Sequence, residues 1–147
     1  MSEMLGNQYF LARKYSLAAD ELEKALSKNP AHKGIRRKLI ICEIQRDNIN
    51  RALDLFASLV EDDVAFIIDA DPIMDDCPCP ELVYDMEEQF NDNKDSIDYY
   101  LKLAMIWLYC DVNKSLHYFN LSMGIDLDNG LIKKIIYHLS TYLLKKE

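Results

Sequence analysis

The sequence predicts an all-α fold in which short helices pair and stack side by side. Apolar residues recur at helical spacing along nearly the whole chain of 147 residues, and no clean strand-like alternation is visible. Four glycines and four prolines are too few for a turn-rich sandwich or barrel. Half of the residues are apolar, so a core can form and disorder of the whole chain is excluded.

We expect eight helices, near residues 2–14, 16–28, 31–46, 48–61, 80–91, 95–110, 112–124 and 129–145. Asn29-Pro30 ends the second helix and opens the third, because a residue before proline is pushed out of the helical region. Asp47-Asn48 separates the third helix from the fourth, and Asn129 can cap the last one. Each helix is short and amphipathic, so its apolar stripe must pack against neighbouring helices.

A repeat is visible in the first half of the chain. Its first copy alternates small and large apolar positions, at Leu5, Gly6, Tyr9, Ala18, Leu22, Ala25 and Pro30. This order and spacing resembles the tetratricopeptide repeat, in which two antiparallel helices approach closely where the small residues lie. A shift of 34 residues places a second copy on Leu39, Ile40, Glu43, Ala52, Phe56 and Leu59. In that copy Ile40 replaces the small residue and Glu43 replaces the tyrosine.

The resemblance implies a right-handed α-α superhelix of about three helical hairpins plus a C-terminal capping helix. We expect one domain, 1–147, with two clear repeats in 1–64, an acidic proline-rich loop in 65–80, and a degenerate repeat and capping helix in 81–147. In one register Ser115, Phe119 and Ser122 take the small, large and small positions of the third repeat. An alternative phase pairs the helix at 80–91 with 95–110, and 112–124 with 129–145.

The net charge of −8 is distributed unevenly. Residues 1–60 carry ten basic and seven acidic residues, whereas residues 61–100 carry fourteen acidic residues and one lysine. The acidic middle would repel phosphate backbones, which disfavours a nucleic-acid partner. Its charge indicates either a solvated loop and helix face or a docking surface for a basic partner.

The segment between the two halves contains possible metal ligands without a complete site. Asp69, Asp71 and Asp75 fit part of a calcium-loop spacing, but the loop's glycine and bidentate glutamate are missing. Cys77 and Cys79 could supply two thiolates, yet no histidine or cysteine offers the remaining ligands at ordinary spacing. We expect a rigid turn and no metal or cofactor.

The sequence contains no motif typical of an enzyme, a membrane span or a secretory signal. There is no nucleophile motif, phosphate-binding glycine loop or dinucleotide fingerprint, so we expect no enzyme. No apolar run reaches membrane-spanning length, and the first residues lack the order of a secretory signal. We therefore expect a cytoplasmic protein whose four cysteines are reduced.

In the tetratricopeptide family the first helix of each repeat lines a concave groove that receives a peptide or a partner's helix. By this resemblance we expect the partner-binding residues to be Met4, Asn7, Phe10, Leu11, Arg37, Lys38, Ile41, Ile44, Gln45 and, from the third repeat, Trp107. Some of these admit a different interpretation, since Phe10 and Trp107 could lie in the core and Arg37 and Lys38 could be a solvated helix start.

Some family members hold a C-terminal carboxylate with a clamp of lysines, asparagines and an arginine. Asn7 matches one clamp position, but Glu3 stands where the first lysine should be and Lys38 where the second asparagine should be. This departure argues against a heat-shock co-chaperone. Arg37 and Lys38 could still bind an acidic peptide through charge-assisted hydrogen bonds.

We therefore expect a non-enzymatic adaptor that binds a protein or peptide in the concave groove, with an acidic group or a C-terminal carboxylate as a candidate ligand. The alternatives are a dedicated chaperone for a secretion or assembly substrate, a structural subunit of a larger complex, and a metal- or redox-responsive switch. We expect no nucleic acid and no membrane. Homo- or hetero-oligomer formation could complete the burial of so short an array.

Overall fold

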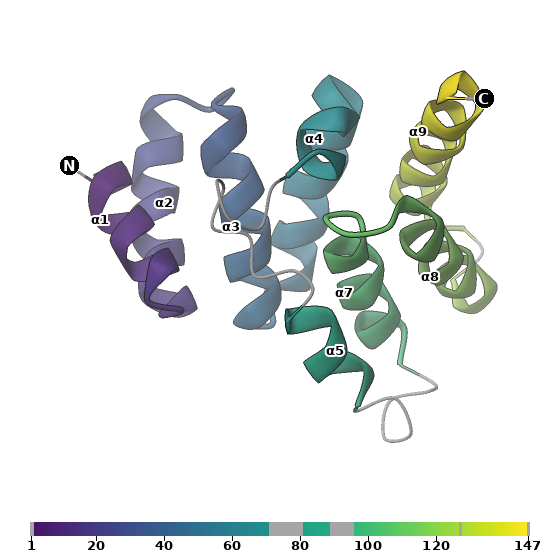
Figure 1. Cartoon of the computed structure of the whole chain (residues 1–147), viewed down its shortest axis with the longest axis horizontal. Coiled ribbons are helices and arrows are strands. Elements are labelled where there is room, and N and C mark those ends of the chain that lie inside the picture. Colours follow the sequence, from purple (N-terminus) through teal and green to yellow (C-terminus); the bar gives the residue numbers. More distant parts are fainter. Residues whose placement is uncertain (1, 71–80, 89–95, 127, 147) are drawn as a thin grey trace. The chain divides into compact units, whose positions relative to one another are not determined.

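A computed structural model describes residues 2–70, 81–88, 96–126 and 128–146 (Figure 1). In these ranges the chain is helical and contains no strand, which confirms the all-α class. The helices are α1 (Ser2–Leu11), α2 (Tyr15–Lys28), α3 (Lys33–Gln45), α4 (Ile49–Ile68), α5 (Glu81–Glu87), α7 (Ile97–Trp107), α8 (Val112–Ile125) and α9 (Gly130–Lys146).

The chain divides into two compact units, Met1–Leu59 and Val60–Glu147, called unit 1 and unit 2 below. Unit 1 holds α1, α2, α3 and the first part of α4, and unit 2 holds the remainder. The expectation of a single domain stays a prediction.

In unit 1, α1 packs on α2 at the small residue that the repeat pattern requires. A Cβ atom placed on Gly6 would lie 2.8 Å from both Cγ and Cδ2 of Leu22. Leu22 and the neighbouring Ala18 are fully buried. The two helices can therefore approach this closely only because residue 6 has no side chain.

The turns that follow α1 and α3 repeat the same backbone conformation. Arg13 and Asp47 are 34 residues apart and both adopt left-handed φ angles, 60° and 62°. The next residue donates its N–H to the carbonyl five residues earlier, from Lys14 to Tyr9 and from Asn48 to Glu43, at 2.9 Å in both cases. This is the hydrogen-bond pattern of a Schellman motif, which satisfies the last carbonyls of a helix. The 34-residue repeat is thus present in the backbone.

A polar network occupies the position where the second repeat departs from the pattern. Glu43 is 1% exposed and accepts hydrogen bonds from Arg46 Nε and, at 3.0 Å, from Asn48 Nδ2. Arg46 also contacts Asp20 of α2, with 3.0 Å between Nη1 and Oδ1. The hydrogen bond to Glu43 raises the pKa of Arg46. Glu43 therefore fixes Arg46, and Arg46 in turn connects the turn after α3 to α2 of the preceding repeat.

Four helix ends differ from the expected ones by three residues or more, since α5 ends at Glu87 and not near 91 and α7 ends at Trp107 and not near 110, and α1 and α4 differ as follows. α1 ends at Leu11 and not near residue 14, because Arg13 leaves the helical region. α4 reaches Ile68, interrupted by extended backbone at Asp63 with φ −162° and ψ 83°. The expected loop at 65–80 is therefore wrong for residues 65–68, which are helical. Its residues 71–80 lie outside the described part of the chain.

In unit 2, α7 packs on α5 and α8, and α8 packs on α9. Asn129 caps α9 as expected, since its Oδ1 accepts from the N–H groups of Leu131 and Ile132 at 3.1 Å. Ser115, Phe119 and Ser122 are fully buried on α8, and Ser115 Oγ donates to the Ala104 carbonyl of α7 at 2.6 Å. The α7–α8 pair thus buries small, large and small side chains as the first repeat does.

Candidate protein-interaction surface

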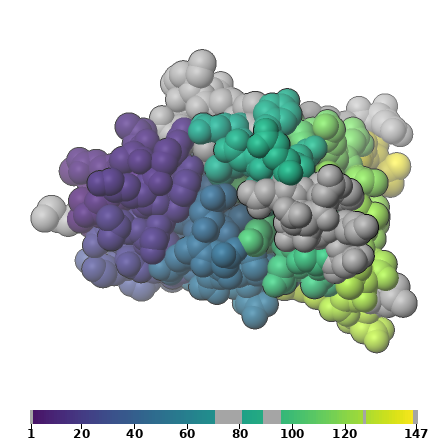
Figure 2. All heavy atoms as spheres, turned by 90° about the horizontal axis from the view of Figure 1, so that it is seen from below, coloured from purple at the N-terminus to yellow at the C-terminus, as the bar shows by residue number. Residues whose placement is uncertain are grey.

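The candidate surface is the side of unit 1 formed by α1 and α3. Figure 2 shows the atoms of α1 (purple) exposed on one face of the unit. α1 and α3 contact each other through two polar pairs. Lys38 Nζ donates to Asn7 Oδ1 at 3.1 Å, and His32 Nε2 lies 3.5 Å from Glu3 Oε1. Two of the expected partner-binding residues, Asn7 and Lys38, are thereby brought together.

Lys38 is held by neutral groups. Its ammonium group contacts the Asn7 amide oxygen and lies 5.7 Å from the centre of the Phe10 ring. No carboxylate of the described residues pairs with it, and the side chain is half-buried. Neither contact neutralises the ammonium group, so it is available for a charge-assisted hydrogen bond with an external anion.

The other expected residues of unit 1 differ in exposure. Met4 and Leu11 are 66% and 58% exposed, and Arg37 and Gln45 are half-buried. Phe10, Ile41 and Ile44 are at most 2% exposed. These three side chains therefore belong to the core. The buried Phe10 ring contributes to the candidate surface only through its contact with Lys38.

Trp107 lies in unit 2 and is 4% exposed. Tyr84 meets its ring edge to face at 6.5 Å, and Lys114 Nζ lies 4.2 Å from its ring centre. The indole N–H is buried and has no hydrogen-bond partner among the described residues. The tryptophan therefore packs between α5 and α8, and its place on a shared groove with unit 1 stays a prediction.

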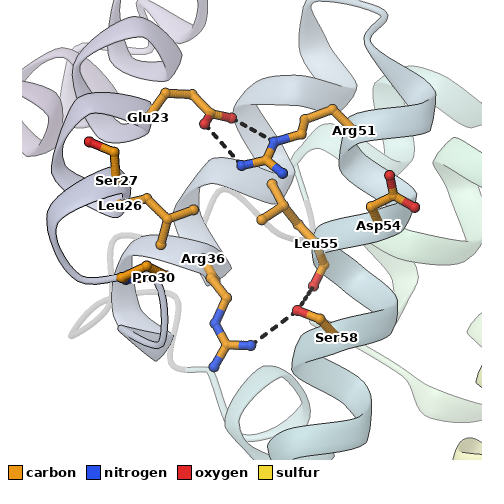
Figure 3. A pocket seen from close by; sticks show the side chains of 9 residues that line it. All are labelled: Glu23, Leu26, Ser27, Pro30, Arg36, Arg51, Asp54, Leu55 and Ser58. Atoms are coloured by element: carbon orange, nitrogen blue, oxygen red, sulfur yellow. Dashed lines mark hydrogen bonds and ion pairs between the residues drawn. The ribbon is translucent and has the colours of Figure 1, made fainter.

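The sequence pattern did not reveal a cavity of about 370 Å³ that α2 and α4 form in unit 1 (Figure 3). At one end Arg51 donates two hydrogen bonds to Glu23, at 2.8 and 2.9 Å, and this interaction raises the pKa of Arg51. At the other end Arg36 donates to Ser58 Oγ at 3.1 Å. The Arg51–Glu23 pair thus joins the second helices of the two repeats, whereas the Arg36–Ser58 pair joins the two helices of the second repeat. No periodicity would have indicated these pairs, because they join polar positions of different helices.

The cysteines divide into two groups. Cys42 is free and fully buried, and burial raises the pKa of its thiol to about 12. Cys110 is disulfide-bonded, so the expectation that all four cysteines are reduced is wrong. Cys77 and Cys79, considered above as metal ligands, lie outside the described residues.

Two other kinds of site are absent from the described residues. No helix there is long and apolar enough to cross a membrane. No group of three or more His, Cys, Asp or Glu side chains in those ranges is placed to hold a metal ion.

Comparison with known proteins identifies a repeat segment in the first half of the chain. Residues 9–67 match the family model described as Tetratricopeptide repeat. This segment runs from α1 into α4 and includes both Schellman turns. No curated protein and no solved structure matches the chain. Residues 9–67 therefore form a tetratricopeptide-repeat segment, and members of that family generally serve as protein–protein interaction modules and not as enzymes.

Proposed function

We propose that the protein is a non-enzymatic adaptor that binds an acidic segment of a partner protein across α1 and α3 of unit 1. The observation that supports this most is Lys38, whose ammonium group contacts an amide and an aromatic ring and no carboxylate of the described residues. A partner carboxylate would complete this arrangement with a charge-assisted hydrogen bond. The exposed Met4 and Leu11 supply apolar surface on the same helix as Asn7.

A binding experiment with defined peptides tests the proposal. The probe is a fluorescein-labelled peptide of alternating glutamate and leucine, followed by fluorescence anisotropy. Replacing its glutamates by glutamine tests side-chain carboxylates, and amidating its C-terminus tests the terminal carboxylate. We expect Lys38→Gln to weaken binding by about tenfold or more, the usual effect of losing a hydrogen bond to a charged group.

Lys24→Gln is the matched control, because it removes one lysine from α2, where the side chain is 65% exposed and pairs with Glu21. We expect this variant to change the affinity by less than about twofold, as is usual for an exposed charge. Equal affinities of the parent and Lys38→Gln would contradict the proposal. Equal losses in both variants would show attraction to net charge only.

The alternatives from the sequence predict different behaviour. A dedicated chaperone would keep an otherwise aggregating client soluble in a one-to-one complex, and a structural subunit would co-purify in a complex that short peptides cannot disrupt. The cytoplasmic location also remains a proposal. The disulfide at Cys110 speaks against it, since disulfides persist mainly in oxidising compartments.

A further inference from the structure

In unit 2 three tyrosines and one carboxylate gather where α5, α7 and α8 meet. Tyr99 Oη donates to the Met86 carbonyl at 2.8 Å, which ties the last turn of α5 to the start of α7. Tyr99 and Tyr100 lie edge to face at 5.8 Å. Tyr100 and Tyr118 of α8 stack at 6.2 Å with an interplanar angle of 23°. We call Tyr99, Tyr100 and Tyr118 the tyrosine cluster.

Glu87, next to Met86, has one carboxylate oxygen without a hydrogen-bond partner. Its Oε1 atom is buried and accepts no hydrogen bond from the described residues, while the residue as a whole is only half-buried. It is also the last residue of α5, a helix with no basic residue in its last turn. Both features are unfavourable for an anion, since a buried acceptor needs a donor and a helix C-terminus favours positive charge. A cation at this carboxylate would relieve both.

Among the described residues of unit 2, the surrounding groups do not supply that cation. Lys114 lies one helical turn before Tyr118, but its ammonium group is held over the Trp107 ring and forms no ion pair with Glu87. Burial, followed by the charge of Glu87, raises the pKa of Tyr118. Burial, followed by Tyr118 and Glu87, raises the pKa of Tyr99 to about 12.

The composition of the cluster selects the chemistry of its ligand. The faces of aromatic rings attract cations, and the attraction strengthens where water is partly excluded. A carboxylate beside such rings adds a full negative charge and hydrogen-bond acceptors for an ammonium or guanidinium group. Unit 2 as a whole is acidic, since residues 60–147 carry eighteen acidic and seven basic residues. Its field therefore attracts basic partners and repels nucleic acids and anionic lipids.

We propose that the surface where α5, α7 and α8 meet binds an arginine or lysine side chain of a partner protein, with Glu87 contacting its charge and the half-buried Tyr118 ring its flat or aliphatic part. Tyr99 and Tyr100 are 6% and 7% exposed and belong to the core against which Tyr118 stacks. This site is separate from the one proposed on α1 and α3, and its ligand has the opposite charge. An adaptor with both sites would bind an acidic segment on unit 1 and a basic segment on unit 2.

The test uses the full chain and fluorescein-labelled hexa-arginine, with hexa-citrulline as the neutral peptide of the same shape. We expect the parent to bind hexa-arginine at least about tenfold more tightly than hexa-citrulline, and Glu87→Gln to remove most of that preference. Glu88→Gln is the matched control, because it removes the same charge from the next, exposed residue. It should weaken binding by less than about twofold.

A second pair of variants tests the rings without changing any carboxylate. Tyr118→Phe keeps the ring and should bind within about twofold of the parent, whereas Tyr118→Leu should lose about fivefold, as expected for a cation–π contact. Lys38→Gln should leave hexa-arginine binding unchanged, which separates this site from the one on unit 1. Hexa-lysine in place of hexa-arginine shows which of the two side chains the site prefers.

Three results would overturn the proposal. The first is equal affinity for hexa-arginine in the parent and in Glu87→Gln. The second is an equal loss in Glu87→Gln and Glu88→Gln, which would mean attraction to net charge alone. The third is an equal effect of the two Tyr118 substitutions, which would show that the ring is not in contact with the ligand. Circular dichroism of each variant confirms that its helices are intact.

Discussion

Gly6→Ala tests the helix contact on which the first repeat depends. The added Cβ would lie 2.8 Å from two carbon atoms of Leu22 and 3.3 Å from its backbone nitrogen. Carbon atoms pack best at about 3.5–4.0 Å, so the new methyl group is too close by at least about 0.7 Å. Leu22 is fully buried and cannot swing into solvent. Overpacking of this kind costs about 1–3 kcal/mol.

Alanine is favoured over glycine within a helix by about 0.5–1 kcal/mol, which opposes the packing cost. We therefore expect Gly6→Ala to lower the free energy of unfolding by about 1 kcal/mol, within a range of about 0–2.5. The measurement is urea denaturation followed by circular dichroism at the helical band. Hydrogen exchange of the α1 and α2 amides shows whether the loss is local to this hairpin.

A double-mutant cycle separates the two effects. In a Leu22→Ala background the clashing atoms are gone, so Gly6→Ala should there stabilise the protein by about 0.5–1 kcal/mol. Gly124→Ala on α8 is a control for helix preference alone, since nothing lies within 4 Å of its Cβ position. The same cost of Gly6→Ala in both backgrounds would refute the close contact between α1 and α2.

Three further predictions concern buried polar groups and cysteines. Glu43→Ala should lower the free energy of unfolding by about 2–4 kcal/mol in urea denaturation, because it removes the buried acceptor that Arg46 Nε and Asn48 Nδ2 share. Glu23→Ala, which breaks a partly exposed pair, should cost less than about 1 kcal/mol, and equal costs would contradict the role of burial. The raised pKa of Cys42, about 12, predicts that its contribution to stability is complete below pH 9 and is lost as the pH rises from 9 to 12. The parent should therefore lose up to about 1.4 kcal/mol more per pH unit than Cys42→Ala, and identical slopes would be inconsistent with a thiol buried in its neutral form. Because Cys110 is disulfide-bonded, thiol titration of the denatured chain should find fewer than four reactive thiols before reduction and four afterwards; four at the outset would rule the bond out.

The first repeat was predictable because its constraints are local and steric. Gly6, Ala18 and Leu22 occupy positions where only one size of side chain fits, so their spacing indicates both the fold and the contact. The turn after α3 was less predictable. Glu43 departs from the pattern, and the network that satisfies it depends on where Arg46 and Asn48 lie in three dimensions.

The candidate sites likewise combine features that the sequence predicts with features that depend on the three-dimensional arrangement. The resemblance placed Asn7 and Lys38 on one face, and the structure joins them by a hydrogen bond. It could not show that Ile41 and Ile44 are buried, because periodicity does not distinguish an apolar groove from a core. The surroundings of Glu87 were also hidden, since they combine three helices and an atom without a hydrogen-bond partner.

The most direct test of the central claim is to map where an acidic peptide binds, by nuclear magnetic resonance of the isotope-labelled chain. The side-chain amide of Asn7 reports on the Lys38 contact, because Lys38 donates to its oxygen. Titration with the glutamate and leucine peptide should shift this amide and the backbone amides of α1 and α3. Shifts confined to the residues that line the cavity between α2 and α4, such as Ser27 and Leu55, would contradict the account.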